Sequence, residues 1–298
     1  MKMKRYKLLL IILLIVGCDE PSIEGCMDES ACNYSAIFEK ADNSMCMELD
    51  CAGVCGGTCT VCECAGVCGL LNEGDAVKDI DENCYETVQI GEQLWMAENL
   101  KVTHYKDGSE IPTGFSNSEW AELETGAYTV YPVDYDEVSI ATCGNNCADV
   151  YGNLYNWAAV DDERGICPEG YHVPTDAEWT TLIIYLDGDA DPDAQGPQSG
   201  IAGGMLKDTG TIEDGDGLWY SPNEVSTNEN GFTALPAGSR VYYSGGSYRS
   251  MGTTGSFWSS SEYGSNYAWG RDLGYYLSGV GRGYYSKQFG FSIRCLKD

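Results

Sequence analysis

The distribution of cysteines constrains the fold of this chain more than any other feature. Nine of its 15 cysteines fall between Cys26 and Cys68, in a stretch with few apolar residues. Such a segment cannot build a hydrophobic core, so crosslinks must replace one. The sequence therefore predicts a small disulfide module at 26–70, a polar linker at 71–83 and a larger domain at 84–298.

The first residues predict export and a lipid anchor. Residues 1–7 are basic, and the apolar run at 8–17 is too short for a membrane span of about 20 residues. Cys18 directly follows a glycine, as in bacterial lipoprotein signals, although an ordinary signal cleaved elsewhere is the alternative. We expect a signal peptide at 1–17, a lipidated Cys18 with a tether at 18–25, and attachment to a membrane, at the outer membrane or the cell surface.

Export also decides the chemistry expected of the cysteines. Oxidising compartments favour disulfides over zinc ligation. The CxxC pair Cys59 and Cys62 has no second pair at zinc-site spacing and no histidine nearby. Nine is an odd number, so one cysteine of the module needs a partner outside it, and Cys84 is the candidate. Cys143 and Cys147 are expected to close a local loop.

The charge of the chain excludes one class of partner. Lys and Arg number 17 against 46 Asp and Glu, which gives a net charge of −29. Nucleic-acid binding requires positive charge facing phosphates, so no nucleic-acid partner is expected. With two histidines, His104 and His172, the chain has little material for a histidine-built metal or catalytic site.

The larger domain carries local signals for an α+β fold with few helices. Alternating apolar residues predict a β-hairpin at 85–96. Thr175 and Glu178 form a capping box that begins a helix over 174–188, and a second short helix is expected at 201–208. Glycine and serine interrupt the C-terminal part, which predicts short strands and long loops. One face of the first helix should be buried, namely Trp179, Leu182, Ile183 and Leu186.

Six ordered blocks span most of this domain. They are VQIGEQLWMAENLK at 88–101, YGNLYNW at 151–157, CPEGYHVPTDAEW at 167–179, GFTALPAG at 231–238, FWSSSE at 257–262 and GFSIRC at 290–295. Their order resembles the Fibrobacter succinogenes major paralogous domain over about residues 80–298. This resemblance implies an exported or surface-associated bacterial protein without an established catalytic activity.

Two of the blocks also resemble formylglycine-generating, sulfatase-modifying proteins. That likeness implies a C-type-lectin-like fold, in which the last strand lies beside the first elements and a Cys167–Cys295 disulfide is expected. Cys295 is the only cysteine after Cys167, so the copper-binding cysteines of those enzymes have no counterpart. The calcium-dependent sugar motifs of true lectins are missing as well. We therefore expect no enzyme activity and no cofactor other than a candidate calcium ion.

That candidate calcium site is a run of alternating carboxylates at Asp187, Asp189, Asp191 and Asp193. Calcium takes six to eight oxygen ligands, which such a loop can supply. Pro192 and Gln198 stand where an EF-hand has glycine and glutamate. A solvated acidic loop is the alternative.

Residues 240–288 have the composition of a binding surface. Tyrosine and arginine alternate with glycine and serine, as in antibody paratopes, and aromatic rings can stack on sugars. We predict that an extracellular carbohydrate or protein binds here, although half of these residues could instead pack the core, Trp258 and Trp269 first. The candidates are Tyr242, Tyr243, Tyr248, Arg249, Tyr263, Tyr267, Arg271, Tyr275, Tyr276, Arg282, Tyr284 and Tyr285.

The function predicted on these grounds is that of a non-catalytic surface lipoprotein that binds an extracellular ligand. One alternative is a structural or assembly component of the cell envelope without a small ligand. Another is a polysaccharide-active enzyme, for which no catalytic carboxylate pair can be chosen among 46 acidic residues without geometry.

Overall fold

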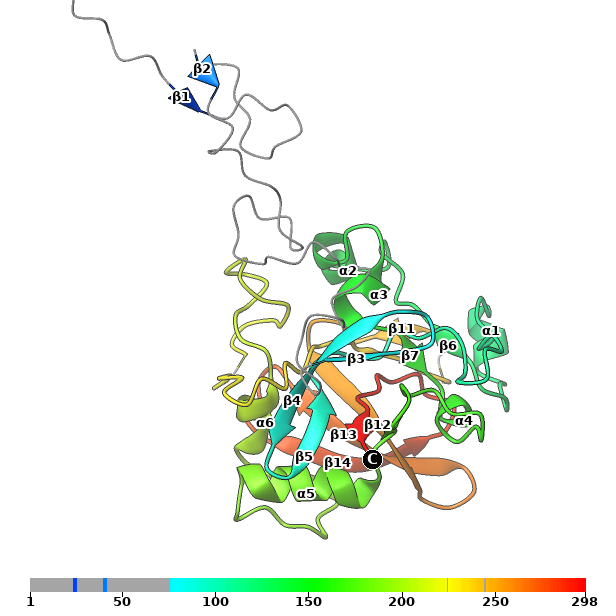
Figure 1. The fold of residues 1–298 in the computed structure, drawn as a ribbon. Helices are drawn as coiled ribbons and strands as arrows, with labels where there is room; N and C mark the ends of the chain where they lie inside the picture. Colours follow the sequence, from blue (N-terminus) through cyan, green and yellow to red (C-terminus); the bar gives the residue numbers. More distant parts are fainter. Residues whose placement is uncertain (1–23, 26–39, 42–75, 224, 244) are drawn as a thin grey trace, which may run out of the picture. The chain divides into compact units, whose positions relative to one another are not determined.

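The structure is a computed structural model that describes residues 24–25, 40–41, 76–223, 225–243 and 245–298 (Figure 1). The chain divides into two units, residues 1–64 and 65–298. In the first unit, β1 (Glu24–Gly25) pairs in parallel with β2 (Lys40–Ala41). The predicted signal peptide, lipidated Cys18, the tether up to residue 23 and the cysteines within 26–70 lie outside the described residues.

The second unit contains a five-stranded sheet that joins its first and last strands. The sheet order is β3-β4-β5-β15-β8. The strands are β3 (Ala76–Lys78), β4 (Cys84–Ile90), β5 (Gln93–Met96), β15 (Leu296–Lys297) and β8 (Tyr171–His172). Leu296 of β15 pairs with Trp95 on one side and His172 on the other. The last strand therefore lies inside the sheet, beside β5. The predicted hairpin is confirmed as β4–β5.

A four-stranded antiparallel sheet forms the other half of this unit, in the order β12-β13-β14-β9. Its strands are β12 (Thr254–Glu262), β13 (Tyr267–Gly274), β14 (Val280–Ser286) and β9 (Gly196–Ser199). The prediction of short strands was wrong for β12–β14. Gly283, within β14, is a packing position, because a Cβ there would lie 2.5 Å from the Tyr285 hydroxyl.

Short helices and two small strand pairs complete the unit. The strand pairs are β6 (Tyr128–Thr129) with β7 (Leu154–Tyr155), and β10 (Ser239–Arg240) with β11 (Tyr248–Arg249). The helices are α1 (Asn117–Trp120), α2 (Glu137–Thr142), α3 (Cys147–Tyr151), α4 (Trp157–Val160), α5 (Asp176–Leu186) and α6 (Ala202–Leu206). The fold is therefore α+β with few helices, as predicted.

Among the described residues, none of the helices has the length and apolar character needed to cross a membrane.

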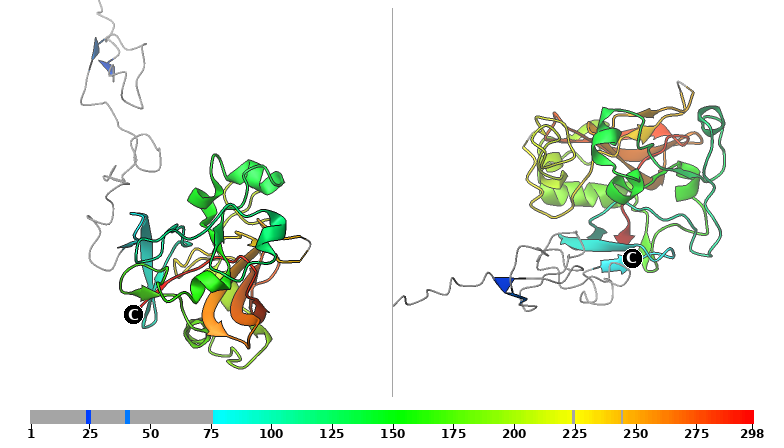
Figure 2. Two further views of the ribbon diagram at one scale, coloured as in Figure 1. Left: turned by 90° about the vertical axis from the view of Figure 1, so that its right-hand side faces the viewer. Right: turned by 90° about the horizontal axis from the view of Figure 1, so that it is seen from above.

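Helix α5 begins as its sequence predicts and packs against the β12–β14 sheet (Figures 1 and 2). The Glu178 N–H donates to Thr175 Oγ1 at 3.2 Å, and the Thr175 N–H donates to Glu178 Oε2 at 2.7 Å. Trp179, Leu182 and Ile183 are buried, whereas Leu186 is half-buried. The capping box and the buried face are thus confirmed, as is the second short helix, α6.

Replacing Thr175 by alanine should lower the free energy of unfolding by about 1 kcal/mol, because the first turn of α5 loses its cap. The measurement is chemical denaturation of the full chain. Thr181→Ala is the matched control, since the Thr181 hydroxyl is exposed and only bonds the Ala177 carbonyl within the helix. Equal losses in the two variants would contradict a capping role.

Arg294 ties the two sheets to the loop around Phe232. It is fully buried and donates to Asn99 Oδ1 at 2.6 Å, to the Met96 carbonyl at 3.2 Å and to the Thr233 carbonyl at 2.6 Å. Desolvation lowers the pKa of this guanidinium, and the charges of nearby acids oppose that shift. Its ordered hydrogen bonds to backbone oxygens offset the burial of the charge.

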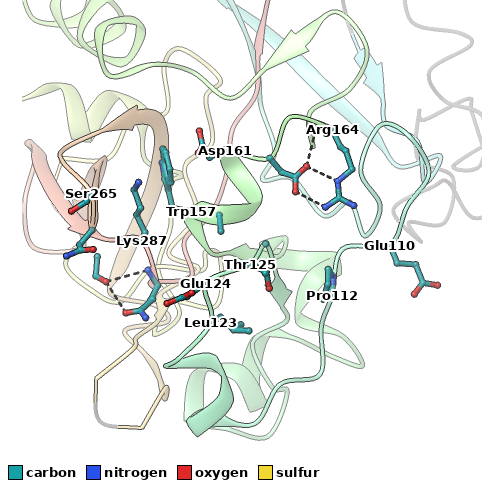
Figure 3. A pocket seen from close by; sticks show the side chains of 16 residues that line it. Glu110, Pro112, Leu123, Glu124, Thr125, Trp157, Asp161, Arg164, Ser265 and Lys287 are labelled. Carbon is teal, nitrogen blue, oxygen red and sulfur yellow. Dashed lines mark hydrogen bonds and ion pairs between the residues drawn. The ribbon is translucent and has the colours of Figure 1, made fainter.

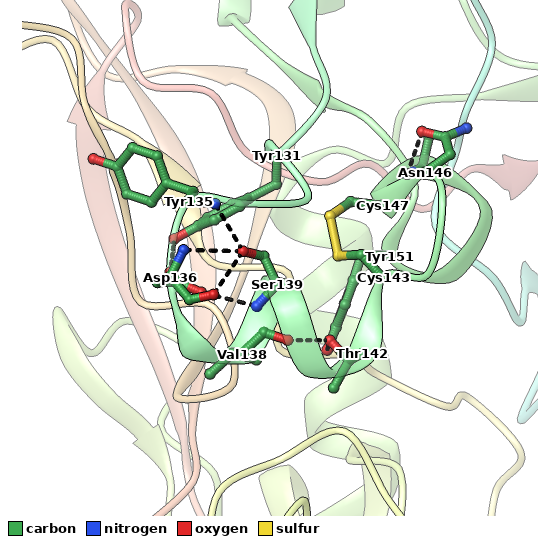
Figure 4. The surroundings of a disulfide bond; sticks show 11 residues. Tyr131, Tyr135, Asp136, Val138, Ser139, Thr142, Cys143, Asn146, Cys147 and Tyr151 are labelled. Atoms are coloured by element: carbon green, nitrogen blue, oxygen red, sulfur yellow. Dashed lines mark hydrogen bonds between the residues drawn. A yellow bond between two sulfur atoms is a disulfide. The ribbon is translucent and has the colours of Figure 1, made fainter.

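Both predicted disulfides of the larger domain are confirmed. Cys167–Cys295 joins the segment before β8 to the residue before β15. Cys143–Cys147 connects the end of α2 to the first residue of α3 (Figure 4). Cys84 is also disulfide-bonded, but its predicted pairing with the 26–68 cysteines lies outside the described residues.

Candidate functional site

The register of β13 and β14 sorts the predicted ligand residues onto two faces of the sheet. Trp269 pairs with Tyr284 and Arg271 with Arg282, so these four side chains share one face. Tyr285 pairs with Ala268 and therefore lies on the other face. A single stretch of sequence thus supplies two surfaces with different surroundings.

Four aromatic side chains, from here on the aromatic cluster, gather at the β12–β13 hairpin end: Tyr263, Tyr267, Trp269 and Tyr284. Tyr263 stacks on Tyr284 with ring centroids 4.2 Å apart and planes 17° apart. Trp269 contacts Tyr263 edge-on at 4.8 Å, and Tyr267 contacts Tyr284 edge-on at 5.7 Å. The three tyrosines are 39%, 42% and 43% exposed, so the cluster is partly open to solvent.

Trp269 corrects one prediction while Trp258 confirms another. Trp258 is fully buried, as expected for the core. Trp269 is only half-buried and belongs to the aromatic cluster, with the Arg282 guanidinium 3.9 Å above its ring. Its neighbour Ala268 takes the buried position because alternate strand residues face opposite sides.

Asp176, the first residue of α5, holds both arginines of this face. Its carboxylate accepts from Arg271 Nη1 at 2.8 Å and from Arg282 Nη2 at 2.7 Å. Burial by itself would raise the pKa of Asp176, but the hydrogen bonds and charges of the two arginines outweigh it and hold that pKa below its usual value. Arg282 is thereby fixed in place over Trp269.

Arg271 does not belong to a ligand surface. Its side chain is 1% exposed, because α5 covers it and both Asp176 and Thr180 accept from its guanidinium. Its place on the predicted binding surface was wrong. Composition alone put it there, whereas the half-buried carboxylate of Asp176 on a neighbouring helix compensates its charge in the interior.

The remaining predicted tyrosines lie elsewhere. Tyr242 and Tyr243 pack edge-on against Phe289, with Arg249 5.4 Å above the Tyr243 ring. Tyr248 packs against Tyr131 and Tyr135, while Tyr275 contacts Tyr276 in the β13–β14 loop. Tyr285 contacts Trp258 and Phe291 of the core. Of the predicted ligand residues, the structure therefore brings together Tyr263, Tyr267, Tyr284 and Arg282. The others lie at separate places in the domain.

A cavity of about 710 Å³ adjoins the same hairpin end (Figure 3). Ser265 and Asn266 line it from the hairpin tip that joins Tyr263 to Tyr267. Ser286, the last residue of β14, lines it together with the following Lys287 and Gln288, while Trp157 of α4 and the segment 123–126 close the other sides. Sequence reasoning missed this cavity, since its lining comes from segments far apart in the chain.

The cavity has an acidic rim. Lys287 Nζ lies 4.1 Å from the Trp157 ring centroid and pairs with Glu262. Arg164 donates to both oxygens of Asp162, and these hydrogen bonds lower the pKa of Asp162. Lys287 and Arg164 therefore each form an ion pair with a carboxylate. Three further carboxylates, Glu110, Glu124 and Asp161, also line the cavity, which favours neutral or cationic ligands over anionic ones.

The acidic loop after α5 does not form a preassembled metal centre. Asp187 Oδ2 accepts from Ser199 Oγ at 2.6 Å, and Asp191 Oδ1 accepts from the Asp193 N–H at 3.0 Å. Within the described ranges, no three Asp, Glu, His or Cys side chains are grouped to hold a metal ion. Calcium binding by Asp187, Asp189, Asp191 and Asp193 stays a prediction.

Comparison with known proteins gives one match. The family model described as Fibrobacter succinogenes major domain matches residues 88–297, more than two thirds of the chain. The matched range contains the whole aromatic cluster and both confirmed disulfides. No curated protein and no solved structure matches.

Proposed function

The chain belongs to the Fibrobacter succinogenes major domain family, and we propose that it is a non-catalytic lipoprotein of the bacterial cell surface that binds an extracellular carbohydrate. In this proposal a lipid on Cys18 anchors the chain at the outer membrane or cell surface, and the cysteine-rich module is a spacer. The larger domain is C-type-lectin-like, which is supported by the pairing of the last strand, β15, with β5 of the first hairpin and by the Cys167–Cys295 disulfide.

The aromatic cluster is the observation that carries this proposal. Tyr263 and Tyr284 hold each other in a preorganised stack, and sugar C–H groups pack well on aromatic faces of this kind. Arg282 is held by Asp176, is 12% exposed, and fixes Trp269 in place by stacking on its ring. Rigid aromatic groups lose little conformational entropy when a ligand binds, so they favour affinity.

The cavity beside the cluster favours a carbohydrate over a protein ligand. Its lining includes hydroxyl and amide side chains at Ser265, Asn266 and Gln288, which can donate to and accept from sugar hydroxyls. The acidic rim and the net charge of −29 disfavour sulfated or uronic-acid polymers. We therefore propose a neutral polysaccharide that stacks on the cluster and extends into the cavity.

Replacing Tyr263 and Tyr284 together by alanine should weaken polysaccharide binding at least about tenfold, because both stacking faces are lost. The measurement is binding of the full chain to an array of neutral polysaccharides, with calcium and again with a chelator. Tyr276→Ala is the matched control, since Tyr276 is 61% exposed but lies in the β13–β14 loop outside the cluster. We expect its affinity to equal that of the unchanged chain.

The array separates the alternatives. Loss of binding with chelator would make the Asp187–Asp193 loop a functional calcium site. An unchanged affinity in the double variant would remove the cluster from the proposal. If the unchanged chain binds no polysaccharide in either condition, the carbohydrate function is wrong, and a protein partner or an architectural role in the envelope takes its place.

A further inference from the structure

A second cavity, of about 480 Å³, lies along β14 on the sheet face opposite the aromatic cluster. Its walls are mostly glycine and apolar groups from β9, β14 and the β13–β14 loop, with Pro197 and Leu277 on two sides. Gly281 and Gly283 face this side because they pair with Asp272 and Gly270 in the strand register. We refer to this cavity as the glycine groove.

Asp272 provides the one acidic side chain in the lining of the glycine groove. Ser256 Oγ donates to Asp272 Oδ1 at 2.7 Å, and the Tyr285 hydroxyl donates to Oδ2. Desolvation raises the pKa of this carboxyl, while the two hydrogen bonds and the charge of Arg271 oppose the shift. Two neutral donors orient the carboxylate, and the Arg271 charge acts on it only from the other face of the sheet, without a direct ion pair.

The neighbouring cations are engaged with other groups. Arg282 lines the groove, but its side chain belongs to the opposite face of the sheet and pairs with Asp176. Arg271 extends to the opposite face, where Asp176 accepts from it. Lys207 Nζ donates to the carbonyls of Gly274 at 3.1 Å and Leu277 at 2.9 Å. In the described part of the chain no basic side chain forms an ion pair with Asp272. A carboxylate in apolar surroundings without a cation is unfavourable, so a positive ligand group that reaches it gains a strong interaction.

We propose that the glycine groove binds a small organic cation, an ammonium group on an apolar stem, with the ammonium against Asp272. The missing side chains make room for the stem: a Cβ built at Gly281 would meet no atom closer than 3.7 Å. Leu277 and Pro197 supply apolar contacts along it. A cavity of this size suits a small ligand whose single polar group fixes its orientation.

The probe that tests this proposal is n-hexylammonium, compared with n-hexanol, which has a similar stem and no charge. Ligand-observed NMR titration of the full chain gives the affinities at neutral pH. We expect hexylammonium to bind at least about tenfold more tightly than hexanol. Asp272→Asn keeps the shape of the side chain and should remove that preference, because the charge is gone.

Gly281→Val provides a second variant that leaves Asp272 in place. A Cβ at Gly281 makes only ordinary van der Waals contacts, so we expect the larger side chain to occupy part of the groove, and both probes should bind less tightly. A preference for hexylammonium that persists in Asp272→Asn would overturn the proposal, and so would binding that Gly281→Val leaves unchanged. Absence of binding up to about 10 mM probe would overturn it too. Polysaccharide binding by the aromatic cluster is measured separately, so either proposal can fail alone.

Discussion

Replacing Asp176 by asparagine is expected to lower the free energy of unfolding by about 3 to 5 kcal/mol. The variant leaves Arg271, which is 1% exposed, and Arg282 without their shared carboxylate. An unpaired buried charge is far costlier than a lost surface contact. Urea denaturation of the full chain measures the change.

Asp162→Asn is the matched control for Asp176→Asn. Asp162 also forms a two-oxygen pair with an arginine, but its partner Arg164 is 38% exposed. Surface pairs of this kind contribute at most about 1 kcal/mol. If the two variants lose the same free energy of unfolding, the burial of Arg271 does not explain the contribution of Asp176 to stability.

The Asp176 effect should also depend on pH. Because the pKa of Asp176 is lowered in the folded protein, its ionised form contributes stability that is present above the usual value of 3.8 and is lost as the pH falls through the folded value. The unchanged chain therefore loses this contribution in acid, while Asp176→Asn never has it. We expect the stability difference between them to shrink below about pH 4. A constant difference across that range would contradict the pairing.

Removing the long-range disulfide with Cys167→Ser/Cys295→Ser should destabilise the protein by about 5 kcal/mol. The bond joins residues 128 positions apart, and closing so long a loop restricts the unfolded chain strongly. Both residues are buried, so the double replacement also places two hydroxyls in the core. Thermal and urea unfolding without reductant measure the loss.

Cys143→Ser/Cys147→Ser is the comparison variant, since the Cys143–Cys147 disulfide joins residues only 4 positions apart. The stabilisation by a disulfide grows with the length of the loop that it closes, and for this short loop it is about 2 kcal/mol. Helices α2 and α3 keep their own caps at Asp136 and Asn146, which do not depend on the bond (Figure 4). Equal destabilisation by the two double variants would show that loop length does not set the contribution.

The elements predicted correctly are those whose signals are local. Thr175 and Glu178 are three residues apart and cap the same helix turn, so their pattern needs no tertiary information. The β4–β5 hairpin likewise follows from alternation around Gly91, whose φ of 60° suits a tight turn. Cys143 and Cys147 are close enough in sequence to pair whatever surrounds them.

The errors occur where both faces of a strand carry aromatic or charged residues. Along β13, Ala268 and Trp269 are adjacent, and alternation cannot say which of the two faces is covered. Arg271 was placed at the surface because its partner, Asp176, is 95 residues away and belongs to a helix. The cavity beside the hairpin has no sequence signal at all, because segments from Glu110 to Gln288 line it together.

The sequence by itself determined the family, the α+β class, the helix caps and the stretch that contains the aromatic surface. Only the tertiary structure decided that Tyr263, Tyr267, Trp269 and Tyr284 form one exposed cluster, that Arg271 is interior, and that Asp272 lies in a glycine-lined groove. The physical reason is that caps and turns depend on residues a few positions apart. Burial and charge compensation of a strand residue depend instead on whichever distant segment packs against its face.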